Sequence, residues 1–204
     1  EIPPDALAKM LDFMERHDGA GVVGPKLVRP DGSLDLACRR SFPTPEISFY
    51  RMTGLSRLFP GSKRFGRYNL TYLDPDDVTE VDSVVGAFML VRREAIEDIG
   101  LMDETFFMYG EDLDWAYRMK RAGWKIYYNP AVTVLHVKKA STRLNPRAQV
   151  EFYRAMEIFY RKHFASDTPW WAHNLILATV RARSRLEELR LALSAGKSKR
   201  VGEQ

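Results

Sequence analysis

The stretch EDLDWAYRMKRAGWKIYY, which runs from Glu111 to Tyr128, decides the fold class. Its polar and apolar residues alternate at helical spacing over Glu111 to Ala122, and Gly123 then ends the predicted helix, since glycine is common just past a helix C terminus. Lys125 to Tyr128 has the β-branched and aromatic residues of a strand. A helix that turns directly into a strand is typical of an α/β layer fold.

The alternation of helix and strand continues on both sides of this stretch. We expect a helix over Pro4 to His17 and a short buried strand at Val22 to Pro25. The apolar run Val81 to Val91 is the strongest strand prediction, and a helix follows it as far as Gly100. After Tyr128, an Asn-Pro pair is expected to separate a second short strand, Ala131 to Val137, from the first.

Two regions depart from this alternation. Phe42 to Asp77 has weak periodicity and scattered prolines and glycines, which favours either a binding loop for an anionic acceptor or short helices that cover the core. From Pro146 the pattern is helical, with a break at residues 166–169. In the last helix, one apolar face is expected to comprise Leu175, Ala178, Ala182, Leu186, Leu189 and Leu193.

The composition is that of an ordinary soluble globular protein, with 45% hydrophobic and 28% charged residues. No apolar run approaches the roughly 18 to 20 residues that span a bilayer. The single cysteine, Cys38, excludes an internal disulfide and a cysteine-rich metal site, so we expect a reducing, cytoplasmic setting. Arginine and lysine crowd residues 181–200, and this basic tail is either a solvated helix or a contact for something anionic.

The densest cluster of ionisable groups surrounds the start of the helix at Glu111. Asp103 and Glu104 precede it, Asp112 and Asp114 follow, and large aromatic residues lie between the two acidic pairs. N-capping explains one or two of these carboxylates. A semi-apolar pocket floor explains the layout better, because desolvation and mutual repulsion raise a carboxyl pKa towards the range of a general base.

Two further features suggest a site. His136 stands near the end of a predicted strand, where open α/β sheets place ligand-binding groups, although a lone histidine is more often structural. Gly86 and Ala87 interrupt a run of bulky residues and leave room for close approach of backbone or ligand, or for a bulge.

Taken in order and at their spacing, these motifs resemble family 2 glycosyltransferases of the GT-A type, and most closely the rhamnosyltransferase-like branch of bacterial surface polysaccharide assembly. The resemblance extends to about residue 165. It rests on Val85–Arg93, Gly100–Phe107, Glu111–Asp114 with Arg118, Gly123–Tyr128, His136 and Phe159–Phe164.

The resemblance implies a partial GT-A (Rossmann-like) α/β domain with a mixed sheet. Residues 1–145 would form its acceptor-side part and residues 146–204 a C-terminal helical extension. It implies an inverting transfer from a nucleotide-sugar donor, assisted by a divalent cation, Mg²⁺ or Mn²⁺. Asp112 would deprotonate the acceptor hydroxyl and Glu111 would support it or meet the acceptor.

The same resemblance assigns binding roles to other positions. His136 would help to hold the metal or pyrophosphate. Substrate would contact Gly86, Ala87, Asp103, Glu104 and Asp114, whereas Arg118 is expected to pair structurally with one of the acids.

The sequence departs from the family pattern at its beginning. It starts where family members have already passed the βαβ nucleotide-binding half and its Asp-x-Asp-type motif, so we expect the isolated chain not to catalyse transfer. Addition of one sugar to a lipid-linked or polysaccharide acceptor is the expected activity of the parent protein. The C-terminal helix would lie on the inner face of the cell membrane or form a homodimer contact.

The competing interpretation is a non-catalytic module that engages an anionic partner through the basic tail. No nucleic-acid motif supports a nucleic-acid partner.

Overall fold

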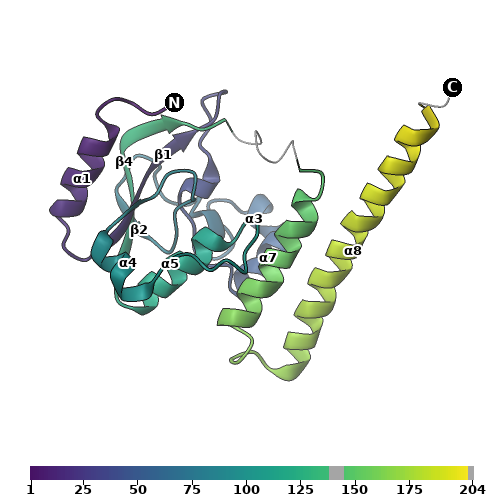
Figure 1. Cartoon of the computed structure of the whole chain (residues 1–204). Coiled ribbons are helices and arrows are strands. Elements are labelled where there is room, and N and C mark those ends of the chain that lie inside the picture. The colour runs from purple at the N-terminus through teal and green to yellow at the C-terminus, as the bar shows by residue number, and fades with distance from the viewer. Residues whose placement is uncertain (138–144, 202–204) are drawn as a thin grey trace. The chain divides into compact units, whose positions relative to one another are not determined.

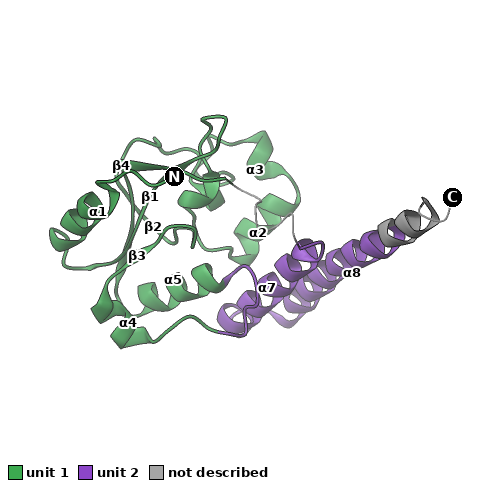
Figure 2. Ribbon diagram, turned by 45° about the horizontal axis from the view of Figure 1, so that its top comes forward, with its two compact units in different colours: residues 1–103, 111–138 green, residues 104–110, 139–204 purple. Residues whose placement is uncertain are grey.

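The computed structural model describes residues 1–137 and 145–201, with side chains as far as residue 193. The chain divides into two compact units (Figure 2). The first comprises residues 1–103 and 111–138, and the second comprises residues 104–110 and 139–204.

A four-stranded mixed sheet forms the centre of the first unit. Its strands are β1 (Ala20–Val28), β2 (Thr79–Val81), β3 (Leu90–Val91) and β4 (Lys125–Leu135), in the spatial order β2-β4-β1-β3. The long central strands β1 and β4 pair in parallel, and the short outer strands pair antiparallel to them. The predicted α/β class with a mixed sheet, consistent with a partial GT-A domain, is therefore confirmed.

Helices cover both sides of this sheet. Figure 1 shows α1 (Ala6–Glu15) on one side and α4 (Arg93–Ile99) with α5 (Glu111–Arg121) on the other. In α1, the buried residues Ala6, Met10 and Met14 recur every four positions, so a single stripe faces the sheet. The helices predicted from Pro4, from Arg92 and from Glu111 are all present, with ends within a few residues of those expected.

Strand β4 is continuous, whereas the sequence predicted two strands. Asn129 pairs with Pro25, but the next pair is Thr133 with Lys26, so β4 advances by four residues where β1 advances by one. This bulge contains Pro130, which cannot donate to a ladder and is tolerated in sheets at such irregularities. The Asn-Pro pair therefore bends the strand without ending it.

The strand predicted over Val81 to Val91 is wrong for most of its length. Only its two ends are strands, because the backbone between them bonds elsewhere. The amides of Asp82 and Ser83 both donate to the carbonyl of Arg40, and the amide of Gly86 donates to a side chain of α5. The middle of this run is thus held by Arg40 and Asp112 and not by the strands of the sheet.

The region from Phe42 to Asp77 contains the short helices of the second alternative. They are α2 (Pro45–Met52), α3 (Leu55–Leu58) and the 3₁₀ turn η2 (Arg67–Asn69), and another 3₁₀ turn, η1 (Leu36–Cys38), precedes them. Helix α2 begins where the Thr44 hydroxyl accepts a hydrogen bond from the Ile47 amide and Pro45 occupies the first turn.

Two helices make up most of the second unit, α7 (Ala148–His163) and α8 (Trp170–Val201). Phe159 and Tyr160 of α7 are buried, as are Leu177 and Val180 of α8. The apolar face predicted for α8 does not pack within the second unit: Leu175, Leu186, Leu189 and Leu193 are 51 to 71% exposed. The helix carries two apolar stripes, and periodicity alone could not tell which one packs. None of the helices described, α8 included, is long and apolar enough to cross a membrane.

Candidate active site

An unusual turn leads into α5. Tyr109 (φ 67°) and Gly110 (φ 84°) are both left-handed, one directly after the other. That conformation costs a residue with a side chain on the order of 1–3 kcal/mol, and such strain is concentrated at functional sites. The turn places Glu111 and Asp112 as the first two residues of the helix, where the positive end of the helix dipole favours negative charge.

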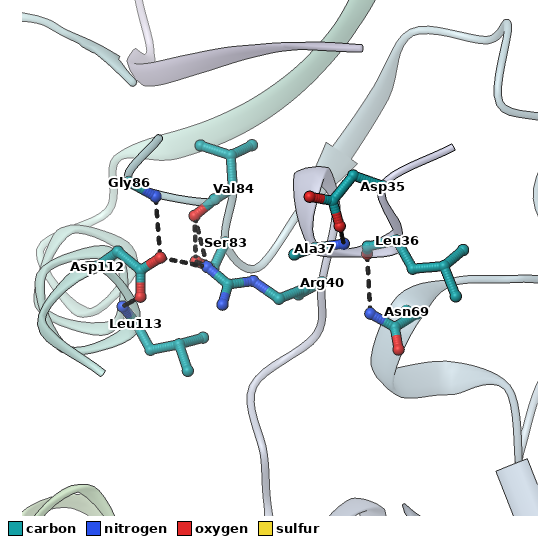
Figure 3. A network of polar contacts seen from close by, with 10 residues as sticks. All are labelled: Asp35, Leu36, Ala37, Arg40, Asn69, Ser83, Val84, Gly86, Asp112 and Leu113. Atoms are coloured by element: carbon teal, nitrogen blue, oxygen red, sulfur yellow. Dashed lines mark hydrogen bonds and ion pairs between the residues drawn. The ribbon is translucent and has the colours of Figure 1, made fainter. Parts of the chain in front are cut away.

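The Asp112 carboxylate is buried, with 6% of the residue exposed, and both of its oxygens are hydrogen-bonded (Figure 3). Oδ2 accepts from Nη2 of Arg40 at 2.7 Å and from the amide of Gly86 at 2.9 Å. Oδ1 accepts from the amide of Leu113 at 2.8 Å. Asp112 is therefore held in one orientation as a carboxylate anion.

Arg40 is the cation that balances this charge, and it is buried as well. Its Nη2 atom also donates to the carbonyl of Val84 at 2.7 Å and lies 3.2 Å from the hydroxyl of Ser83. Burial opposes the charge of Arg40, but the interactions with Asp112 and Tyr68 together outweigh it, and the pKa of Arg40 is raised. Figure 3 shows Arg40 reaching the Asp112 carboxylate beside the loop of Ser83 and Val84.

Glu111 is in a different electrostatic state from its neighbour. Its Oε2 atom is buried and has no hydrogen-bond partner among the described residues. Burial, and to a smaller extent the negative charge of Asp112, raise the pKa of Glu111. The raised carboxyl pKa anticipated for this acidic cluster is thus found at Glu111.

Gly86 connects the buried carboxylate to the surface. The residue is exposed, as is Ala87 after it, although the amide of Gly86 bonds to Asp112. A Cβ atom added at Gly86 would lie 3.5 Å from Cβ of Asp112, an ordinary contact distance. The structure therefore brings Gly86, Glu111 and Asp112 together beside an exposed loop.

The other predicted acids differ in their surroundings. Asp114 is fully buried and pairs with Nε of Arg118 at 2.9 Å, which is the structural pairing expected for that arginine. Arg118 also donates to the carbonyls of Ile99 and Leu101, so it ties α5 to the end of α4. Asp103 is half-buried in the first unit, whereas Glu104 is exposed and belongs to the second.

His136 follows β4 directly and is oriented by a buried carboxylate. Its Nδ1 atom lies 2.9 Å from Oδ2 of Asp35, a residue with no exposed surface. A carboxylate only accepts, so Nδ1 carries the proton and neutral His136 presents Nε2 as its acceptor. Metal-binding histidines are commonly oriented in this way.

The Asp35–His136 contact and the Arg40–Asp112 contact both depend on residues 35–41, which we call the polar segment. These residues were not singled out from the sequence. Asp35 at its start holds His136 and Arg40 near its end holds Asp112. Arg39 between them donates to the carbonyls of Leu73 and Asp74. The only signal in the sequence was a pair of arginines after the apolar triplet Leu-Ala-Cys. That pattern predicts the end of a strand and not a buried charge.

Comparison with known proteins identifies the family to which this chain belongs. Residues 2–151 match the family described as glycosyltransferase like family 2. The match covers most of the chain, so the chain belongs to the family 2 glycosyltransferases, a family of enzymes. The predicted family, with its rhamnosyltransferase-like character, is confirmed.

Curated relatives agree with this assignment. The chain is 30% identical over 169 residues to an N-acetylglucosaminyl-diphospho-decaprenol L-rhamnosyltransferase of Mycobacterium tuberculosis, a match that covers 82% of the chain and 53% of the relative. It is 40% identical over 58 residues to the rhamnosyltransferase WbbL of Escherichia coli, which covers 28% of the chain and 22% of the relative. A hexosyltransferase of low-salt glycan biosynthesis, Agl10 of Haloferax volcanii, is 27% identical over 115 residues, 56% of the chain and 32% of the relative. The chain thus spans about half the length of the first of these relatives, or less of the others.

Proposed function

We propose that this chain forms the acceptor-side part of an inverting glycosyltransferase that adds one sugar, from a nucleotide-sugar donor, to a lipid-linked or polysaccharide acceptor of the cell envelope. The observation that carries the proposal is the ionised, oriented carboxylate of Asp112 beside the exposed loop of Gly86. In keeping with the rhamnosyltransferase relatives, we place residues 1–145 in the transferase domain and 146–204 in a helical extension. We also place the reaction at the inner face of the cell membrane.

In the proposed reaction, Asp112 takes the proton of an acceptor hydroxyl. The hydroxyl oxygen then forms a bond to the anomeric carbon of the donor, while the bond from that carbon to the diphosphate oxygen breaks and its electron pair leaves with the nucleoside diphosphate. A single displacement of this kind inverts the configuration at the anomeric carbon. Because the Gly86 amide and Arg40 already bond to Oδ2, the acceptor would approach Oδ1, whose bond to the Leu113 amide is local to the helix.

Glu111 is the second candidate for the base. Burial raises the pKa of its carboxyl, which is the direction that a general base requires, and its buried Oε2 lacks a partner among the described residues. Asp112 instead is fixed in one orientation by Arg40 and the Gly86 amide. Substitution of each residue alone distinguishes these roles.

A divalent cation would need ligands beyond those that the described residues supply. Among residues 1–137 and 145–193, no group of three His, Cys, Asp or Glu side chains is placed to hold a metal ion. His136 can offer one ligand through Nε2, since Asp35 occupies Nδ1. The described residues therefore do not fit a complete metal site, and no step above depends on one. A bound cation would offset the charge of the leaving diphosphate.

Apart from Asp112 and Glu111, donor and acceptor contacts are proposed only at exposed or half-buried residues. Gly86, Ala87 and Glu104 are exposed and Asp103 is half-buried, so all four can meet a ligand. Asp114 is fully enclosed and paired with Arg118, and we leave it out of the proposed contacts.

The experiment is a transfer assay on the natural gene product that contains this chain, with a panel of nucleotide-sugars and a membrane extract as the source of acceptor. Asp112→Asn is expected to lower kcat at least about 100-fold, the usual contribution of a general base. Glu97→Gln, which removes an exposed carboxylate on α4, serves as the matched control and should leave kcat unchanged. If Asp112→Asn keeps most of the activity and Glu111→Gln abolishes it, the base is Glu111. Absence of transfer with every donor would favour the non-catalytic binding module instead.

A further inference from the structure

Helix α8 has one face that packs within the second unit and another that is exposed. On a helical wheel of about 100° per residue, His173, Leu177, Val180, Ser184, Glu187 and Leu191 share one face. Each of these residues is buried or half-buried, so this face packs within the second unit. His173 of this face lies 3.1 Å from the hydroxyl of Tyr160 on α7, and Arg181, which lies outside this face, donates to Glu157 of α7 at 2.8 Å.

A second apolar stripe runs along the opposite side of the same helix, and we call it the outer stripe. Its members are exposed: Trp171, Leu175, Ala178, Ala182, Leu186, Leu189 and Leu193. The large ones among them are 51 to 71% exposed, with Trp171 at 60%. A row of large apolar side chains exposed to water marks a surface that binds another protein or a membrane.

Charged residues border the outer stripe in a regular way. On the same wheel, Arg181 and Arg185 lie along one edge of the stripe and Arg183 and Arg190 along the other. Glu187 and Glu188, the only acids between Trp170 and Leu193, lie outside the area that these arginines enclose. Arg181 is paired with Glu157 and Arg190 with Glu187, so Arg185 on one edge and Arg183 on the other carry the positive charge that borders the outer stripe.

This charge pattern decides between the two occupants that fit an apolar helix face. A second copy of α8 would bring arginines against arginines along both edges, and the nearby acids Glu157 and Glu187 are already paired with Arg181 and Arg190. An anionic bilayer surface accepts the arginines at its headgroups and the leucines and tryptophan just below them. We propose that α8 lies flat on an anionic membrane surface through its outer stripe.

The inference requires neither the transfer reaction nor its substrates. It concerns only where this chain is held, and it can fail while the proposed transfer stands. The test accordingly contains no sugar donor and no acceptor.

Sedimentation with lipid vesicles tests the proposal on the full 204-residue chain. The chain is expected to bind vesicles of phosphatidylcholine with phosphatidylglycerol and to bind vesicles of phosphatidylcholine alone far more weakly. Arg183→Gln with Arg185→Gln should weaken binding to the anionic vesicles about 30-fold, since each arginine near such a surface contributes about a factor of five. Arg57→Gln with Lys63→Gln removes the same charge from exposed sites outside α8 and should leave binding nearly unchanged.

The apolar part of the contact is tested separately. Leu186→Ser with Leu189→Ser should abolish binding without changing the helical circular dichroism, because both side chains are exposed. Brominated acyl chains should quench the fluorescence of Trp171, and Trp171→Phe should remove that quenching.

Two results overturn the proposal. One is a wild-type chain that does not sediment with anionic vesicles. The other is a chain that is dimeric by analytical ultracentrifugation and becomes monomeric with Leu186→Ser and Leu189→Ser, while vesicle binding is the same for both proteins. That second result would assign the outer stripe to a second copy of the chain.

Discussion

Replacement of Arg40 by methionine should strongly destabilise the first unit. The change keeps much of the side-chain volume but leaves the Asp112 carboxylate buried without its cation. Loss of one partner from a buried ion pair typically costs about 3–5 kcal/mol. Asp112 retains the amides of Gly86 and Leu113 as donors, so we expect the lower end, about 3 kcal/mol of unfolding free energy.

The informative measurement is a double-mutant cycle with Asp112→Asn. Asp112→Asn alone leaves the Arg40 charge buried without its carboxylate and should also cost about 3 kcal/mol of unfolding free energy. In the double variant no buried charge is unpaired, so its cost should remain near 3 kcal/mol and fall well short of the 6 kcal/mol expected from addition. Guanidinium unfolding gives these values. A background of Trp170→Phe and Trp171→Phe confines the fluorescence signal to Trp115 and Trp124 of the first unit.

Arg39 provides the matched control, because it is a buried arginine next in sequence whose donors meet backbone carbonyls and not Asp112. Arg39→Met and Asp112→Asn should therefore be additive to within about 0.5 kcal/mol. The reasoning is refuted if Arg40→Met costs less than about 1 kcal/mol, the level of a surface pair, or if it is as additive with Asp112→Asn as Arg39→Met is.

Three further predictions concern neighbouring features. Gly24→Ala should destabilise the chain by about 1–3 kcal/mol in guanidinium unfolding, because its Cβ would lie 2.7 Å from Val84. Gly86→Ala should cost less than about 1 kcal/mol, and equal costs for the two variants would contradict this prediction. Nitrogen-15 spectra should show that the neutral imidazole of His136 carries its proton on Nδ1 and not on Nε2, and Asp35→Ala should remove that preference. Because burial raises the pKa of Glu111 in the folded chain, its ionisation works against folding as pH rises above about 4.5. Glu111→Gln should therefore gain stability relative to wild type over that range, and a constant difference in unfolding free energy between the two would exclude the effect.

Local patterns were sufficient for the elements whose own residues carry a clear helix or strand signal. The helix at Glu111 has its acids in the first turn and its basic residues in the last, and it forms as expected. The strand at Val22 is a run of small and β-branched residues that is buried on both faces, which a central parallel strand requires.

The failures occur where distant groups satisfy the backbone or the charge. Val81 to Val91 has the composition of a strand, but Arg40 and Asp112 take up its hydrogen bonds. Their positions are 72 residues apart in sequence, and no local pattern links them. The acidic cluster was visible from the sequence alone, whereas the buried arginine that balances it was not, because arginine is normally expected at the surface.

The bulge in β4 constrains how the length of this strand can change. Side chains alternate between the two faces of a strand, so an odd number of extra residues reverses which face each later residue points to. The bulge adds three residues between the pairs of Pro25 and Lys26, and His136 lies beyond it. Deletion or insertion of a single residue in the bulge would turn the positions that follow to the opposite face and take the imidazole away from Asp35. Loop lengths among homologues should accordingly differ here in steps of two, and a gap of one should coincide with loss of the Asp35–His136 pair.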